Sequence, residues 1–145
     1  MRVREALTIH AAPDRVAALY RDYAGWPRLF PDTIRGVRLL SAQAGEIRVE
    51  VDHRSEGHVL NVIRQQTPTI ITLEESKPRY DATFVNRFDP SPEGTRYTVD
   101  AVIRFRMPYA LLAPFLGRMV SRRIHRFVLE PVRVAAEASA SGTTI

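Results

Sequence analysis

Between residues 33 and 106, apolar and polar side chains alternate with a period of two, and no other feature of the 145-residue chain constrains the fold as strongly. The alternation is clearest in IRVEVDH (47–53), where isoleucine and valine share one face and charged residues occupy the other. Side chains of a β-strand point to opposite faces in turn, so this pattern predicts strands with one buried face. Short runs of turn residues divide the stretch into consecutive strands, which pair antiparallel when the turns are short. We predict strands at residues 34–42, 46–54, 57–66, 69–75, 80–88 and 95–106.

A further strand and two short helices are predicted before this stretch. Residues 2–10 alternate like the later strands. Pro13 suits the first position of a helix, and Gly25 is a natural terminator. One more helical turn fits between Pro27 and Pro31.

One long helix is predicted after the strands, at residues 109–138. Its apolar residues recur at helical spacing, which gives it one buried stripe. Pro114 and Pro131 are expected to start or kink this helix, because proline lacks the donor that the interior of a helix needs.

This order of elements predicts an α+β fold with a helix-grip arrangement: a curved antiparallel sheet of about seven strands wrapped around the long C-terminal helix, with two short helices after the first strand. The sheet must cover its apolar face, and only the final helix is long enough to do so. A twisted sheet cannot close tightly around one helix everywhere, so we expect a cavity between them. We predict one domain at residues 1–138, and a flexible tail at 139–145, where the composition becomes small and polar.

The segment GWPRLF (25–30) holds the only tryptophan of the chain. In the predicted fold, Trp26 and Phe30 would close one end of the curved sheet and line the cavity. An ordinary hydrophobic corner without a ligand explains the same residues, and the sequence leaves both interpretations open.

The composition of the chain argues against several classes of function. The chain has no cysteine, which excludes disulfides and thiolate metal sites. Its four histidines show no metal-ligand spacing, and neither a nucleophile elbow nor a glycine-rich phosphate loop is present. We therefore predict no metal and no cofactor. No apolar run is long enough for a transmembrane helix, and the charged, alternating N-terminus is unlike a signal peptide, so we expect a cytoplasmic protein.

The net charge is +5, carried almost wholly by arginines that are spread along the chain. A nucleic-acid footprint would cluster, so no nucleic-acid partner is predicted. The exception is a stripe formed by Arg118, Arg122 and Arg126 on one helix face. This stripe fits a solvated face or a docking surface for an acidic partner or an anionic membrane.

Three segments carry a resemblance to a known family: LTIHAAPDRVAALYRDYAGWPRLFPDTIRGVRLL (7–40), EGTRYTVDAVIRFRMP (93–108) and the closing helix. They resemble the START/Bet v 1-like (helix-grip) superfamily, in particular its bacterial polyketide cyclase/dehydrase and lipid-transport branch. The resemblance implies a START-like domain that binds a small apolar or aromatic ligand (a lipid, a quinone or a polyketide-like molecule) between sheet and helix. The alternative is an aromatase/cyclase-type enzyme acting on a carrier-tethered polyketide, with an acidic acyl carrier protein as partner.

The resemblance to aromatase/cyclases also implies a cavity arginine on the strand GHVLNVIRQQ (57–66), which makes Arg64 a candidate catalytic residue. A tyrosine expected beyond the WP segment has no counterpart here. The position of Arg64 depends on the hairpin before it. A two-residue loop at 56–57 turns Leu60, Val62 and Arg64 inward, whereas a three-residue loop turns Val59, Asn61 and Ile63 inward. We favour the first register, because it hides two apolar side chains and exposes an amide.

His53 ends the apolar series of its strand, and an imidazole on a cavity wall is a candidate acid or base. A hydrogen-bonded structural histidine is the alternative. The remaining candidates are inward-facing residues predicted to contact a ligand: Trp26, Phe30, Val51, Val62, Tyr80, Phe84, Asn86, Tyr97, Val99, Leu116 and Val120.

Overall fold

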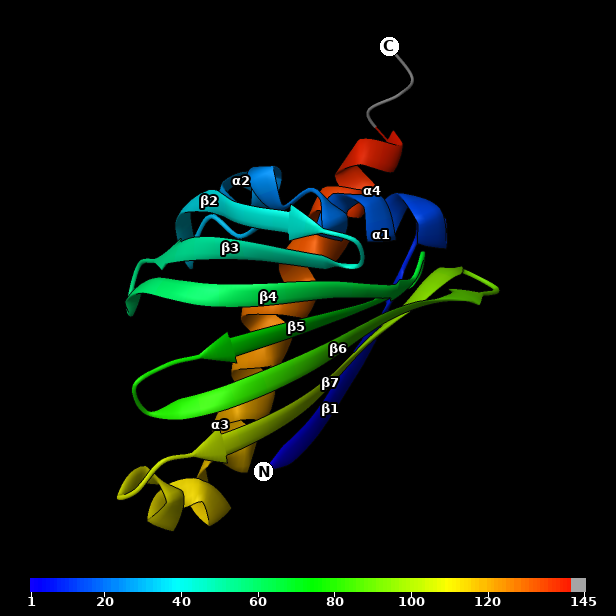
Figure 1. Ribbon diagram of the computed structural model, residues 1–145. Coiled ribbons are helices and arrows are strands. Elements are labelled where there is room, and N and C mark those ends of the chain that lie inside the picture. Colours follow the sequence, from blue (N-terminus) through cyan, green and yellow to red (C-terminus); the bar gives the residue numbers. More distant parts are fainter. Residues whose placement is uncertain (142–145) are drawn as a thin grey trace.

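A computed structural model describes the backbone of residues 1–141 and the side chains of residues 1–138. Seven antiparallel strands form one curved sheet in the order β1-β7-β6-β5-β4-β3-β2 (Figure 1). The predicted sheet is therefore confirmed. Its strands are β1 (Arg2–Ile9), β2 (Ile34–Gln43), β3 (Glu46–His53), β4 (Gly57–Thr67), β5 (Ile70–Ser76), β6 (Tyr80–Ser91) and β7 (Gly94–Phe105).

The two short helices predicted after the first strand are present as α1 (Pro13–Arg21) and α2 (Trp26–Leu29), with a 3₁₀ turn, η1 (Tyr23–Gly25), between them. Proline lies in the first turn of both helices, where a missing N–H costs nothing. Both helices lie at the upper end of the molecule in Figure 1, where α2 packs against β2 and α1 packs against β6, β7 and α4.

The predicted C-terminal helix is also present, and it runs across the concave face of the sheet (Figure 1). It follows a 3₁₀ turn, η2 (Tyr109–Leu112), and consists of α3 (Ala113–Ile124), a π-helical segment η3 (His125–Leu129) and α4 (Glu130–Ser141). Pro131 explains the wide π segment, because it cannot donate a hydrogen bond to the carbonyl of Phe127 and its ring crowds that carbonyl. The predicted tail began at 139, but α4 continues to Ser141; the rest of that prediction, at 142–145, lies outside the described residues.

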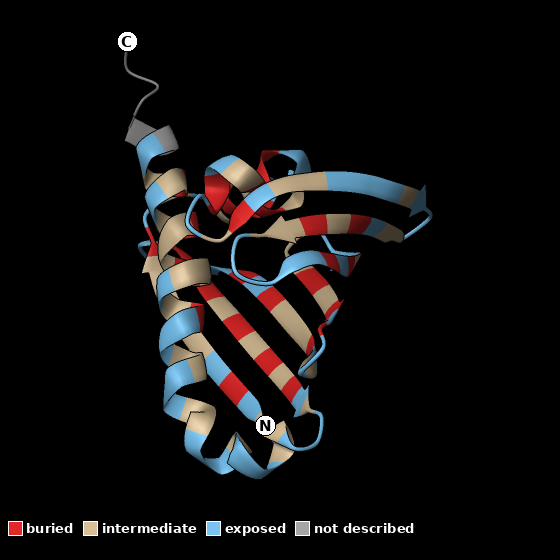
Figure 2. Ribbon diagram, turned by 90° about the vertical axis from the view of Figure 1, so that its left-hand side faces the viewer, coloured by how far each residue is buried: buried red, intermediate tan, exposed pale blue. Residues whose placement is uncertain are grey.

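The core lies between the sheet and this helix. Buried and less buried residues alternate along the central strands, as the period of two predicts (Figure 2). From the helix, Leu129 and Val132 are fully buried against the sheet. The strand residues that share this buried face include Ala82, Asn86, Phe88, Tyr97, Val99, Ala101 and Ile103.

The β3–β4 hairpin does not have the register that we favoured. His53 pairs with Gly57, so residues 54–56 form a three-residue loop. Gly57 has a φ of 72°, the left-handed conformation that completes this type of hairpin and that glycine adopts without strain. The change of one residue in register turns β4 over. Its inward residues are Val59, Asn61 and Ile63, all at most 6% exposed, while Leu60 is 42% exposed.

Candidate functional site

A cavity with two parts, which share several lining residues, lies between the sheet and the C-terminal helix. The inner part, about 190 Å³, lies against the α2 end, and the outer part, about 800 Å³, lies against η2 and the first turns of α3. The outer part falls within the range of about 300–1,000 Å³ that is typical of ligand sites. Both parts are lined by Ser55, Glu56, Lys77, Tyr80, Phe84, Arg123 and Ile124.

Packed aromatic rings close the inner end. Tyr20, Trp26 and Phe30 contact one another with ring centroids 5.6–6.4 Å apart, and Phe88 lies 5.9 Å from Tyr20. The indole Nε1 of Trp26 donates a 2.8 Å hydrogen bond to the carbonyl oxygen of Tyr20, which fixes the ring. Trp26 and Phe30 are almost fully buried and also line the cavity. This corner is therefore part of the core and a wall of the cavity at once.

A hydrogen-bonded triad supports this wall. The Asn86 side chain donates to the Tyr20 hydroxyl at 3.1 Å and accepts from the Tyr97 hydroxyl at 2.7 Å. Burial raises the pKa of both tyrosines, so both remain protonated. Asn86 lines the cavity, whereas Tyr97 supports it from behind.

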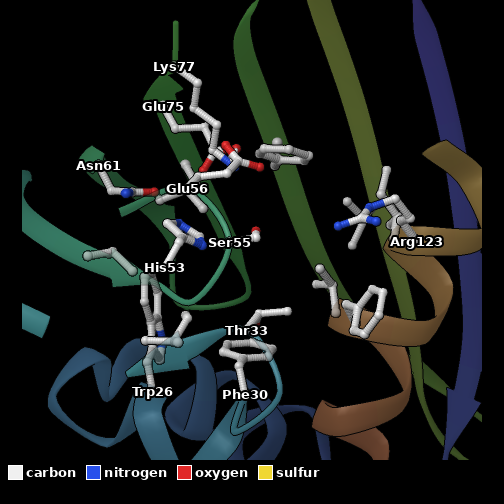
Figure 3. A pocket seen from close by; sticks show the side chains of 18 of the residues that line it. Trp26, Phe30, Thr33, His53, Ser55, Glu56, Asn61, Glu75, Lys77 and Arg123 are labelled. Carbon is white, nitrogen blue, oxygen red and sulfur yellow. Dashed lines mark ion pairs between the residues drawn. The ribbon is translucent and has the colours of Figure 1, made fainter. Parts of the chain in front are cut away.

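The opposite wall of the inner cavity carries a charge cluster in which Glu75 and Lys77 are buried and Glu56 is partly exposed (Figure 3). The Lys77 Nζ lies 3.0 Å from a Glu56 oxygen and 3.4 Å from a Glu75 oxygen. The side chains of Lys77 and Glu75 are each 7% exposed. Burial raises the pKa of Glu75, although Lys77 opposes the shift. Burial alone would lower the pKa of Lys77, but Glu75, the Tyr80 hydroxyl and Glu56 together outweigh that effect and raise it, so the ammonium stays charged.

His53 points into the cavity beside this cluster (Figure 3). Its Nε2 is buried and has no hydrogen-bond partner among the described residues. Burial, with a contribution from Lys77, lowers the pKa of His53 to about 4. The imidazole is therefore neutral at pH 7, with one nitrogen available to a ligand.

Most of the predicted ligand contacts line the cavity. The inner part is lined by Trp26, Phe30, Val51, His53, Tyr80, Phe84, Asn86 and Val99. The outer part is lined by Tyr80, Phe84, Leu116 and Val120.

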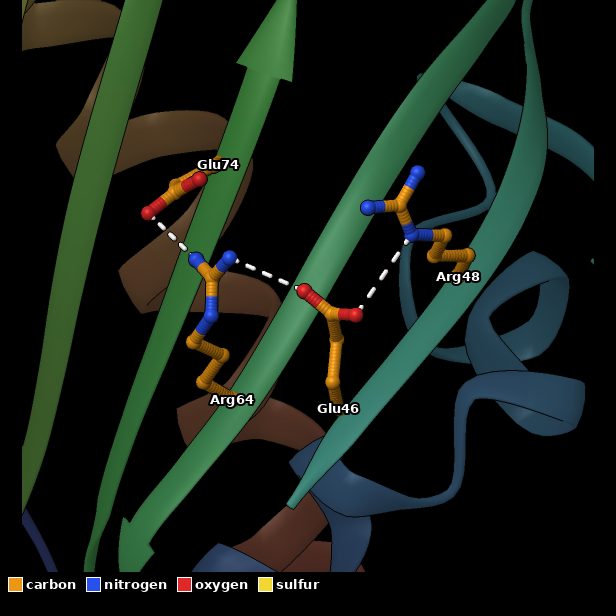
Figure 4. A network of polar contacts seen from close by, with 4 residues as sticks. All are labelled: Glu46, Arg48, Arg64 and Glu74. Atoms are coloured by element: carbon orange, nitrogen blue, oxygen red, sulfur yellow. Dashed lines mark hydrogen bonds and ion pairs between the residues drawn. The ribbon is translucent and has the colours of Figure 1, made fainter. Parts of the chain in front are cut away.

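Arg64 and Val62 were placed wrongly, because their position followed from the wrong register. Arg64 lies on the outer face of the sheet and forms ion pairs with Glu46 and Glu74, with 2.9 Å between its Nη2 and a Glu46 oxygen (Figure 4). Arg48 contacts the other Glu46 oxygen at 3.6 Å. Neither Arg64 nor Val62 lines the cavity.

Four charged residues that line the cavity were not predicted from the sequence: Glu56, Glu75, Lys77 and Arg123. A signal for Glu75 was present, since it follows Ile71 and Leu73 at a spacing of two on the same strand. Lys77, the only lysine of the chain, continues that spacing into the next turn.

The structure also bears on metal sites, on membrane-spanning helices and on the arginine stripe. Among the side chains of residues 1–138, no group of three or more His, Cys, Asp or Glu could hold a metal ion. No helix of this part of the chain is long and apolar enough to cross a membrane. Arg118, Arg122 and Arg126 are exposed on the C-terminal helix, as both open interpretations of the stripe require.

The arrangement of sheet and helix places the molecule among the helix-grip proteins. Over residues 1–135 the sequence matches the family described as polyketide cyclase/dehydrase and lipid transport. The chain belongs to this family, which supports a ligand-binding or cyclase role. No curated protein matches the sequence.

Solved structures show the same fold at low sequence identity. TTHA0849 from Thermus thermophilus has a TM-score of 0.78 and 16% identity, with 97% of this chain and 99% of that chain covered. The Zhui aromatase/cyclase from Streptomyces sp. R1128 has a TM-score of 0.78 and 16% identity, with 100% and 99% covered. The di-domain aromatase/cyclase StfQ of the steffimycin pathway has a TM-score of 0.77 and 16% identity, with 97% of this chain and 51% of StfQ covered.

Proposed function

We propose that this protein binds a small apolar or aromatic molecule, such as a lipid, a quinone or a polyketide-like compound, between the sheet and the C-terminal helix. The observation that carries the proposal is the two-part cavity, whose wall is mostly apolar in area and whose charged groups lie in two places, Glu56, Glu75 and Lys77 on the strand side and Arg123 on the helix side. Ligand sites in proteins usually have this composition, because apolar walls supply affinity and a few fixed polar groups supply orientation.

The open end of the cavity supports this proposal. Around η2 and α3, large apolar side chains remain exposed: Met107, Leu111, Leu112, Phe115 and Met119. Leu112 and Met119 line the outer part of the cavity. A ligand can therefore enter over an apolar surface while the aromatic corner keeps the other end closed.

Binding is tested with N-phenyl-1-naphthylamine, a neutral dye whose fluorescence rises in apolar surroundings. The variant Leu73→Trp fills space on the cavity wall, so we expect it to weaken dye binding by about tenfold or more. The control Leu60→Trp adds the same ring to the exposed outer face and should leave the affinity unchanged. Equal affinity in both variants, with both folded, contradicts binding in this cavity. Native mass spectrometry of protein purified from its own host would identify a co-purified ligand.

A second candidate function is the aromatase/cyclase reaction on a carrier-tethered polyketide. It is favoured by the family and by the groups on the cavity wall that can move protons, namely Glu75, Tyr80 and His53. The position of Arg64 removes the arginine that the resemblance implied, so these three groups would have to act in its place. The acidic acyl carrier protein belongs to this second candidate. An unchanged product distribution when His53→Gln and wild-type protein act on a polyketide substrate would remove His53 from such a mechanism.

A further inference from the structure

We propose that the charged wall of the inner cavity selects ligands whose buried end is a neutral hydroxyl, a phenol or an alcohol, over ligands that end in a carboxylate. This inference rests on the proposed ligand-binding function and specifies the chemistry of the buried end of the ligand. Its basis is the cluster of Glu56, Glu75 and Lys77 together with the unpaired nitrogen of His53 (Figure 3).

The cluster offers no free positive charge to an anion. Lys77 is the only cation in it and already lies within 3.4 Å of two carboxylates. With both carboxylates ionised, the cluster carries one excess negative charge; with Glu75 protonated, it is neutral. A ligand carboxylate placed here would lose its hydration without gaining a net positive partner, which is costly in a poorly hydrated site.

A hydroxyl group fits the same wall, because it both donates and accepts hydrogen bonds. It can donate to a carboxylate oxygen of Glu75 or Glu56. It can also pair with His53 Nε2, whichever ring nitrogen carries the proton. The unpartnered nitrogen would then gain the partner that buried polar atoms normally have.

The other cation that lines the inner cavity within the described residues is Arg123, on the helix side (Figure 3). Its guanidinium lies 5.3 Å from the centre of the Phe127 ring, and its side chain is exposed. Charge is therefore divided between two walls of the cavity. The strand wall, formed by the cluster of Glu56, Glu75 and Lys77, has no excess of positive charge. The helix wall has one solvated cation, Arg123. An acidic group on a ligand would be directed to Arg123, leaving the strand wall to the neutral end.

The test compares three probes that share one ring system: 2-naphthol, 2-naphthoate and naphthalene. Their affinities are measured by titration calorimetry at pH 7, where the naphthol is neutral and the naphthoate is ionised. We expect wild-type protein to bind 2-naphthol about tenfold more tightly than 2-naphthoate. Glu75→Gln removes a negative charge and leaves Lys77 with Glu56, so we expect the ratio to fall to about threefold or less.

The matched control is Glu74→Gln. Glu74 is the neighbour of Glu75 on β5, and its side chain points to the outer face, where it pairs with Arg64. The two variants change the net charge equally, but only Glu75→Gln changes the cavity wall. If Glu75→Gln does not fold, Glu56→Gln, at a side chain that is 34% exposed, tests the same charge.

The outcomes separate this inference from the proposed function. If wild-type protein binds naphthoate as tightly as naphthol, or if Glu75→Gln and Glu74→Gln leave the same ratio, the inference is wrong while ligand binding stands. If none of the three probes binds, naphthalene included, the proposed function itself fails. A ratio that falls in Glu75→Gln and is retained in Glu74→Gln supports the inference.

Discussion

Two ion-pair networks lie on opposite faces of the same sheet and differ chiefly in their contact with water. Glu74 and Glu75 are consecutive residues of β5, yet Glu74 points outward to Arg64 and Glu75 points inward to Lys77. The side chains of the outer pair are 44% and 41% exposed, whereas those of the inner pair are 7% exposed. Each face of the sheet therefore has a pair of a glutamate and a cation, but only the inner pair is shielded from water.

The difference follows from solvation. Water screens the outer network of Arg48, Glu46, Arg64 and Glu74, so its ion pairs contribute little and are easily replaced (Figure 4). Within the inner cluster, Glu75 and Lys77 have lost most of their hydration, so each of these two charges depends on its partner. The inner cluster should therefore be sensitive to single substitutions, while the outer network should tolerate them.

The largest effect is expected for Lys77→Met. The substitution keeps the length of the side chain and leaves the buried Glu75 without its cation. Breaking a buried ion pair in this way typically costs about 3–5 kcal/mol of the free energy of unfolding. Urea unfolding at pH 7 measures the loss.

The double variant Lys77→Met with Glu75→Gln serves as the control. It leaves no unpaired charge at position 75 and should recover part of the lost stability. A Lys77→Met protein within about 1 kcal/mol of wild type would show that Glu75 does not depend on Lys77, and the contrast between the two networks would fail.

A smaller effect is expected from the pH dependence of His53. Its pKa in the folded protein is about 4, below the 6.5 of an ordinary histidine, because the ring is largely buried. Between these values the unfolded chain binds a proton that the folded protein does not. The contribution of the neutral His53 ring to the free energy of unfolding is therefore complete above about pH 6.5, and it is lost as the pH falls toward 4.

The matching variant is His53→Gln, which cannot titrate. It should lose less stability than wild type between pH 6.5 and pH 4, by about 1–2 kcal/mol, since partial exposure of the ring reduces the full effect. Glu75, whose pKa burial raises, contributes with the opposite sign, so the two proteins are compared at each pH. If the free energy of unfolding falls equally with pH in the wild type and in His53→Gln, the imidazole at position 53 is not buried in its neutral form.

The fold could be predicted from the sequence, because the period of the apolar pattern and the order of strands and helices along the chain determine it. Alternation placed Tyr97, Val99 and Ala101 on one face, and a single long helical pattern left only one element to cover that face. The cavity wall was harder to predict, because one residue of hairpin register exchanges the two faces of β4. Hydrophobicity favoured burying Leu60, but the conformation of Gly57 decided the register and buried Asn61 instead.

The charge cluster escaped prediction for a different reason. Glu75 was on the inward side of the alternation, but a single strand does not reveal which cation will face it. Lys77 meets Glu56 only through the β3–β4 loop, some twenty residues earlier in the chain. A buried polar group at an inward position is thus visible from the sequence, while its partner depends on the tertiary fold.

The smallest effect is expected for Arg64→Ala, which tests the outer network directly. If solvent screens its ion pairs with Glu46 and Glu74, the midpoint of thermal unfolding should change by no more than about 2 °C. The affinity for N-phenyl-1-naphthylamine should also stay the same, because Arg64 does not line the cavity. Differential scanning fluorimetry and dye titration measure the two quantities on one preparation. A large loss of dye binding without unfolding would mean that the outer face controls the cavity through the strands, and it would return Arg64 to the set of functional residues.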